Sequence, residues 1–260
     1  MPACLLLGGW LAGCATVTAP TRPSVTEQPP VEGWTAEKLV QILSRRDQQF
    51  QSLRALATVY YRGPEGRRGF EEAILVRRPD RLRLETLSAL GAILVLTANG
   101  NQVIGYHPRE GLFFRGQASK ENLLRYTQIP LELEEITALL MGLPPVPAAS
   151  SWTLGDSSLF RYVDGKPVEV VTFDPGLELP VRWYRLSADG TPEVSAVFEN
   201  FSPTPGGSFP LKIIVETTGQ QRRLEITYQE PEINVEISPG LFLQEKPANA
   251  KEVPIEALGK

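Results

Sequence analysis

The sequence contains very few of the residues that catalytic and metal sites most often use. Its 260 residues include one histidine and two cysteines, and both cysteines lie within the first fourteen positions. The rest of the chain has no thiol, which excludes disulfides, thiolate zinc sites and cysteine nucleophiles there. His107 stands beside Pro108 at the end of a strand-like run, and no Gly-x-Ser-x-Gly turn accompanies it. We therefore expect a protein that is not an enzyme and that uses no metal and no bound cofactor.

Long apolar runs and a surplus of positive charge are also missing. The sequence has no apolar run of about 18 residues, the length that a membrane-spanning helix needs. Its 26 basic and 30 acidic residues give a net charge of −4, so nothing indicates electrostatic binding to nucleic acid. The 42% of apolar residues are enough to build a core, and the 23 prolines and 22 glycines suit a chain with many turns.

The first residues have the pattern of an export signal. Residues 1–13 form a short apolar run that ends in small residues, and Cys14 follows at once. The tetrapeptide Leu11-Ala12-Gly13-Cys14 resembles the lipobox of bacterial lipoproteins. This resemblance implies cleavage before Cys14, a diacylglycerol on its sulfur and an acyl chain on its new amino group. The alternative is a chance match after a simple export signal, and no Lys or Arg precedes the apolar run, as export signals usually require.

The lipobox resemblance also sets an expected location. Two or more acyl chains hold a protein stably on a bilayer. Residues 14–33 would then be the acylated cysteine and a tether, because Pro20, Pro23, Pro29 and Pro30 stand there among small polar residues. We expect a protein anchored by lipid to the outer membrane of the cell, with its folded domain facing the periplasm.

The remaining sequence predicts a β-rich domain over residues 34–245 and a tail over 246–260. An amphipathic helix is expected from Thr35 to about Leu53, and two short helices over 120–126 and 132–141. Elsewhere polar and apolar residues alternate between turn pairs such as Asp164-Gly165, which is typical of antiparallel hairpins. The fold class is mainly β with a few helices (α+β): one highly curved antiparallel sheet, an incomplete barrel of about eleven strands, with a helical lid. The run Ala92–Leu96 is apolar on both faces, so it is either a central strand or the lining of an apolar cavity.

The middle of the chain contains a series of short motifs: Pro79-Asp80-Arg81-Leu82-Arg83-Leu84-Glu85, Ser88-Ala89-Leu90-Gly91, Asn99-Gly100, Tyr106, Leu123-Leu124, Ile129-Pro130-Leu131 and Leu139-Leu140-Met141-Gly142-Leu143-Pro144. In these motifs the chain resembles the LolA and LolB family of lipoprotein-sorting proteins. The resemblance implies an incomplete β-barrel whose apolar cavity, closed by helices, shields acyl chains. A lipobox points to the membrane-anchored receptor type. In that type an exposed leucine before a glycine, here Leu90 before Gly91, helps insertion into the membrane; the alternative is that Leu90 packs inward.

On this fold we expect a defined set of inward-facing residues to line the ligand cavity. They are Leu82, Leu84, Leu94, Leu96, Val103, Leu133, Ile136 and Leu140. The expected partners are the outer membrane, the acyl chains of lipoproteins or other lipids, and a periplasmic lipoprotein carrier. Residues beyond about 200 do not follow the receptor pattern closely. Two alternatives therefore stay open: a lipoprotein of the same fold that binds another amphiphile, and a structural envelope lipoprotein with a filled core that binds a protein partner.

Overall fold

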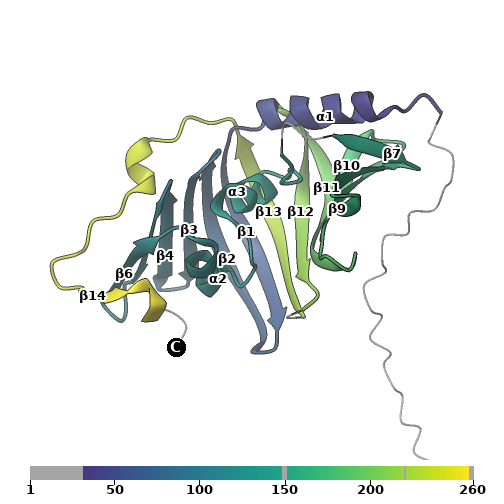
Figure 1. Ribbon diagram of the computed structural model, residues 1–260. Helices are drawn as coiled ribbons and strands as arrows, with labels where there is room; N and C mark the ends of the chain where they lie inside the picture. Colours follow the sequence, from purple (N-terminus) through teal and green to yellow (C-terminus); the bar gives the residue numbers. More distant parts are fainter. Residues whose placement is uncertain (1–31, 148–150, 220, 258–260) are drawn as a thin grey trace, which may run out of the picture.

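The computed structural model describes residues 32–147, 151–219 and 221–257, and their strands form one curled sheet (Figure 1). The sheet has 14 strands in the order β14-β6-β5-β4-β3-β2-β1-β13-β12-β11-β10-β9-β8-β7. The strands are β1 (Ser52–Gly63), β2 (Gly66–Arg77), β3 (Arg81–Ser88), β4 (Gly91–Asn99), β5 (Gln102–His107), β6 (Leu112–Gln117), β7 (Trp152–Gly155), β8 (Ser158–Val163), β9 (Lys166–Asp174), β10 (Leu179–Leu186), β11 (Pro192–Thr204), β12 (Gly207–Thr217), β13 (Arg222–Ile233) and β14 (Lys251–Pro254).

Strands that are consecutive in sequence are neighbours in the sheet, with two exceptions: β1 pairs with β13, and β14 pairs with β6. Successive strands form antiparallel hairpins within two series, β1–β6 and β7–β13. The two series are joined in the middle by the antiparallel pair β1–β13, in which Ala57 lies opposite Tyr228. The predicted curved, mainly β fold is confirmed. The sheet has more strands than expected because β7 and β14, each four residues long at an edge, are too short to show an alternating pattern.

Local sequence explains where the predicted hairpins turn. Asp164 and Gly165 both have positive φ, at 50° and 73°, as the two central residues of a type I′ turn require. Gly100, after Asn99, has a φ of 62°. These turns match the twist of the flanking strands, so the chain reverses without splaying the pair.

The three α-helices are α1 (Ala36–Gln49), α2 (Lys120–Thr127) and α3 (Leu133–Leu140). Thr35 caps α1 by accepting a hydrogen bond of 3.2 Å from the Lys38 backbone N–H, and Ser119 caps α2 in the same way. The helix predicted to reach Leu53 ends at Gln49, because Ser52 already begins β1.

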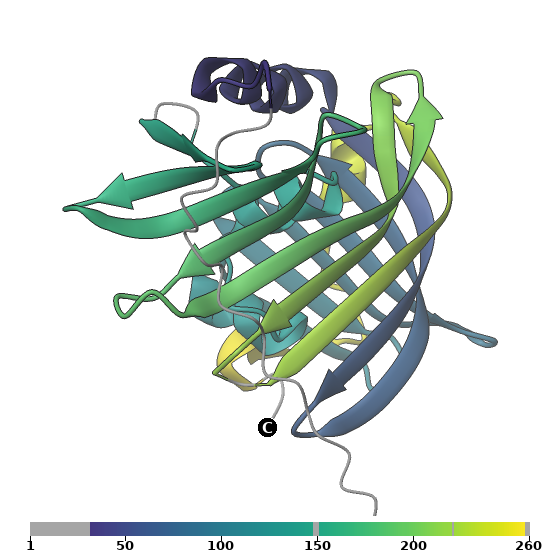
Figure 2. The same ribbon diagram turned by 90° about the vertical axis from the view of Figure 1, so that its right-hand side faces the viewer.

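Helices α2 and α3 lie inside the curl of the sheet, whereas α1 lies across one end of it (Figures 1 and 2). Residues 120–146, which contain α2 and α3 and which we call the inner segment, belong to the central apolar cluster through Leu123, Leu133 and Leu139. Two 3₁₀ turns, η1 (Pro239–Phe242) and η2 (Ile255–Ala257), lie near the C-terminus. No helix among the described residues is both long and apolar enough to cross a membrane.

The C-terminal segment belongs to the sheet, although we expected a tail from residue 246 onward. Strand β14 pairs in parallel with β6, with Val253 opposite Phe114. Ile255, directly after β14, is 1% exposed. It packs so closely on Gly116 that a Cβ atom at position 116 would lie 2.4 Å from Ile255 Cγ2. Local pattern does not reveal this pairing, because the partner strand lies far earlier in the chain.

The chain just before this segment contributes to the environment of the run Ala92–Leu96. On the outer face of the sheet, Gln244 Nε2 donates hydrogen bonds to Thr97 Oγ1 at 3.0 Å and to the Ile104 carbonyl at 3.2 Å. On the inner face, Leu96 is fully buried in the central cluster. Strand β4 is thus covered on both sides from Val95 to Ala98, whereas the first half of the run is not, since Ile93 is 36% exposed.

Candidate functional site

The concave face of β1–β6 carries rows of apolar side chains that run across the strands. In one row Leu84 lies opposite Ile74 of β2 and Leu96 of β4. In the next row Leu82 lies opposite Val76 and Ala98. These residues are buried in the central cluster, where side chains of the inner segment cover them.

Seven of the eight residues predicted to line the cavity belong to this one cluster. They are Leu82, Leu84, Leu96, Val103, Leu133, Ile136 and Leu140. Leu94 is outside it: its side chain is only partly buried, and it lies opposite Thr86 of β3. The alternation thus identified the inward face correctly and did not reveal where along the strand the cluster stops.

The interior between sheet and helices is filled. Leu82, Leu96 and Val103 are 0% exposed, and the α3 residues that cover them are at most 7% exposed. A ligand could reach these sheet residues only after side chains of the inner segment had moved away. The sequence left open whether the interior is filled or empty, and in this structure it is filled.

Helix α3 is held from both series of strands. The Thr137 hydroxyl donates a hydrogen bond to the Pro79 carbonyl in the β2–β3 turn. The buried Tyr228 hydroxyl of β13 donates one of 2.8 Å to the Leu140 carbonyl, and burial raises the pKa of this phenol. An ion pair joins Arg185 of β10 to Glu135 of the helix. A few polar contacts thus position an otherwise apolar helix.

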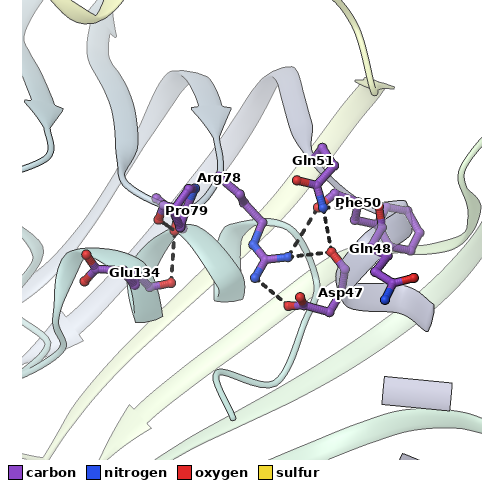
Figure 3. Close-up of polar contacts among 8 residues, drawn as sticks. Asp47, Gln48, Phe50, Gln51, Arg78, Pro79 and Glu134 are labelled. Atoms are coloured by element: carbon purple, nitrogen blue, oxygen red, sulfur yellow. Dashed lines mark hydrogen bonds and ion pairs between the residues drawn. The ribbon is translucent and has the colours of Figure 1, made fainter. Parts of the chain in front are cut away.

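Helix α1 is fastened at its C-terminal end by Arg78 (Figure 3). The Arg78 guanidinium donates to the Asp47 carbonyl at 2.8 Å and pairs with the Asp47 carboxylate at 2.5 Å. The Gln51 amide donates to the same Asp47 carbonyl at 2.6 Å. Cations and donors at a helix C-terminus satisfy its free carbonyls, so this contact fixes α1 against the β2–β3 turn.

A polar group that the sequence reasoning missed lies on the concave face. Glu72 of β2 is 4% exposed and accepts hydrogen bonds from the Thr86 hydroxyl of β3 at 2.9 Å and from the Tyr126 hydroxyl of α2 at 3.0 Å. Burial raises the pKa of Glu72 to about 7. The signal was present in the alternation of β2, because Glu72 stands in phase with the inward-facing Ile74 and Val76.

His107 and Leu90 differ in how far their side chains are exposed. His107 is partly buried and packs edge-on against Phe114, with ring centroids 5.6 Å apart. Leu90 is 85% exposed in the β3–β4 turn, followed by Gly91 with a φ of 102°. Of the two alternatives for Leu90, the structure shows the exposed one. Cys14 lies outside the described residues.

Comparison with known proteins places this geometry in a fold group. No family model matches the sequence, and no curated protein matches it. Among solved structures, a LolA superfamily protein from Nitrosomonas europaea superposes with a TM-score of 0.55 at 11% identity, covering 82% of this chain and 99% of the other. The fold of this chain is LolA-like.

Two further solved structures superpose on this chain about equally well. A putative outer membrane lipoprotein-sorting protein domain from Vibrio parahaemolyticus matches with a TM-score of 0.56 at 9% identity, over 80% of this chain and 97% of that one. A DUF1329 family protein from Desulfovibrio piger matches with a TM-score of 0.56 at 13% identity, over 80% and 96%. At these identities the likeness establishes the LolA fold, which the sequence motifs had indicated, in a divergent form.

Proposed function

We propose that this protein binds the acyl chains of lipoproteins or other lipids between the concave face of its sheet and the inner segment. The observation that carries the proposal is the apolar cluster that joins Leu84 and Leu96 of the sheet to Ile136 of α3. Sheet and helix contribute separate surfaces to it, so an acyl chain can replace one of them. Shielding an acyl chain requires no catalytic group, and we propose none.

The energies on the two sides of this exchange are similar. Exposing the four buried leucine and isoleucine side chains of α3 costs about 1.5–3 kcal/mol each, or about 6–12 kcal/mol together. Removing roughly fifteen methylenes of an acyl chain from water contributes about 12 kcal/mol, at about 0.8 kcal/mol each. The two terms are of the same order, and the exchange has a net gain of about 0–6 kcal/mol, so loading needs no separate energy source.

The finer form of the proposal is a LolB-like receptor that accepts lipoproteins from a periplasmic carrier and inserts them into the outer membrane. The lipobox resemblance at Cys14 supports a lipid anchor there. The exposed Leu90 in the β3–β4 turn supports a contact with the acyl region of a bilayer, since its 85% exposed side chain is free to leave water for an apolar phase. Such a protein would face the periplasm from the outer membrane.

A second candidate is a structural envelope lipoprotein that binds a protein partner and no lipid. The filled interior favours it, because Leu82, Leu96 and Val103 have no exposed surface. In this case the inner segment would be a permanent part of the core.

The two candidates differ in what they bind. The full chain with Cys14→Ser, purified without detergent, is mixed with an acylated lipoprotein and with the same protein lacking its lipid. We expect only the acylated form to co-purify, and a photoreactive acyl chain to label β3, β4 and α3. Binding of neither form would support the structural candidate, and equal binding of both would indicate a protein-binding surface.

A further inference from the structure

A cleft of about 140 Å³ opens between α1 and the chain that follows α3. Its apolar walls are Val40 and Leu43 of α1, Leu143, Val146 and, across from them, Trp152 of β7. Leu43 and Leu143 also belong to the central cluster, and the other three pack against it. The cleft therefore borders the apolar interior directly.

Besides Asp47, whose carboxylate is paired with Arg78, the charged residue that lines this cleft is Arg46 of α1. It is 4% exposed, although arginine is almost never buried without a partner of opposite charge. Its guanidinium lies 4.9 Å from the centre of the Phe50 ring, and Nη1 donates a hydrogen bond of 2.8 Å to the Ser208 carbonyl. Neither contact neutralises the charge.

The other two guanidinium nitrogens of Arg46, Nε and Nη2, are buried and have no hydrogen-bond partner. No carboxylate in the described part of the chain lies within 4.0 Å of this guanidinium, and the adjacent Asp47 carboxylate is paired with Arg78. Burial lowers the pKa of Arg46 to about 10, which still leaves it charged at neutral pH. A buried cation with free donors costs stability unless an anion joins it.

The free nitrogens define the chemistry of that anion. Nε–H and Nη2–H point from the same edge of the planar guanidinium, and this edge matches the two oxygens of a carboxylate or a phosphate. The apolar walls beside it suit a hydrocarbon chain that continues from the anionic group.

We propose that Arg46 binds the oxyanion of a single-chain amphiphile, a carboxylate or phosphate headgroup, whose chain lies along Leu43 and Leu143 toward the interior. This inference rests on the proposed acyl-chain binding and narrows its ligands to anionic amphiphiles. It assigns α1 a second role besides covering the end of the sheet.

The test uses isothermal titration of the full chain carrying Cys14→Ser with five probes: dodecanoate, dodecyl phosphate, 1-dodecanol, acetate and inorganic phosphate. We expect dodecanoate or dodecyl phosphate to bind at least about tenfold more tightly than 1-dodecanol, and Arg46→Gln to remove that preference. Arg45→Gln is the matched control, because it removes the same charge from an exposed position of the same helix. Acetate and inorganic phosphate should bind weakly, because they lack the chain.

Each result decides one point. Equal binding of dodecanoate, dodecyl phosphate and 1-dodecanol, or unchanged binding by Arg46→Gln, would overturn the role of Arg46 and leave acyl-chain binding intact. Inorganic phosphate that binds as tightly as dodecyl phosphate would overturn the amphiphile in favour of a free anion. No binding of any dodecyl probe would overturn both this inference and the proposed function.

A second measurement covers the case in which Arg46→Gln does not fold. The Arg46 Nε–H resonance of the ¹⁵N-labelled protein, assigned with Arg46→Lys, should shift on addition of dodecanoate and not of 1-dodecanol. An unshifted resonance at saturating dodecanoate would overturn the proposal.

Discussion

The Tyr126 hydroxyl donates a hydrogen bond of 3.0 Å to Glu72 Oε1 and thereby joins helix α2 to the middle of strand β2. The Thr86 hydroxyl binds the other carboxylate oxygen at 2.9 Å. The inner segment is thus attached to the concave face by a carboxyl group that titrates close to neutral pH, since burial raises its pKa to about 7.

The first prediction concerns the pH dependence of stability at Glu72. The folded state holds this proton to about pH 7, whereas the unfolded chain releases it near the ordinary value of 4.5. Between these values the folded state binds more protons, so the free energy of unfolding should fall as pH rises from about 4.5 to about 7. At about 1.36 kcal/mol per pH unit, the total is about 3 kcal/mol.

Glu72→Gln should remove this loss, because the amide stays neutral at every pH. Urea denaturation gives the free energy of unfolding of variant and wild type at pH 5 and at pH 8. The decrease between the two pH values should be smaller in the variant. Glu71→Gln is the control: Glu71 lies on the other face of β2 and binds Thr58 and Gln229. If wild type and Glu72→Gln show the same pH slope, Glu72 does not titrate as stated.

The second prediction concerns the attachment of α1. Arg78→Gln removes the ion pair to Asp47 and the donor to its carbonyl, which weakens the C-terminal end of the helix. We expect the free energy of unfolding to fall by about 1–2 kcal/mol, and by less than a buried ion pair would give because Asp47 is exposed. Amide hydrogen exchange should become faster in α1 only. Uniformly faster exchange throughout the sheet would show instead that Arg78 supports the whole fold.

The third prediction concerns Leu90. Leu90→Glu should leave the free energy of unfolding within about 0.5 kcal/mol of wild type, because the side chain is 85% exposed. It should nevertheless reduce delivery of an acylated lipoprotein from the protein to liposomes. Leu177→Glu, at a leucine that is 55% exposed in the β9–β10 turn, should deliver normally. Equal delivery by all three proteins would exclude a membrane role for this turn.

The fourth prediction concerns lipid attachment. Cells fed an alkyne-labelled fatty acid should incorporate the label into the wild-type protein and not into Cys14→Ser, because the thiol is the expected site of acylation. Cys4→Ser provides the control, since Cys4 belongs to the predicted signal peptide. Label retained by Cys14→Ser would contradict the lipobox.

Much of the fold followed from local pattern. The alternation in Arg81–Glu85, the capping residues Thr35 and Ser119, and the turn at Asp164-Gly165 each depend on neighbours within a few residues. Such patterns identify strands, helix starts and hairpins, and with them a sheet of mainly antiparallel order. They also separated the inward side chains from the outward ones, which is why seven predicted cavity residues share one cluster.

The remaining features depend on contacts between distant parts of the chain. The parallel pairing of β14 with β6, the closure of the interior by α3 and the cover that Gln244 gives to β4 all join segments far apart in sequence. Their positions are determined by the curvature and register of the complete sheet, and no local period encodes these.

The sequence by itself therefore determined the class of fold, the inward face of its strands and a candidate lipid anchor. Only the tertiary structure decided that the interior is filled, that Leu90 is exposed and that the ionisable side chains of Glu72 and Arg46 are buried. The physical reason is that burial is a property of the assembled layers: the alternation of a strand and the period of a helix place a glutamate or an arginine on one face whether or not another element covers that face.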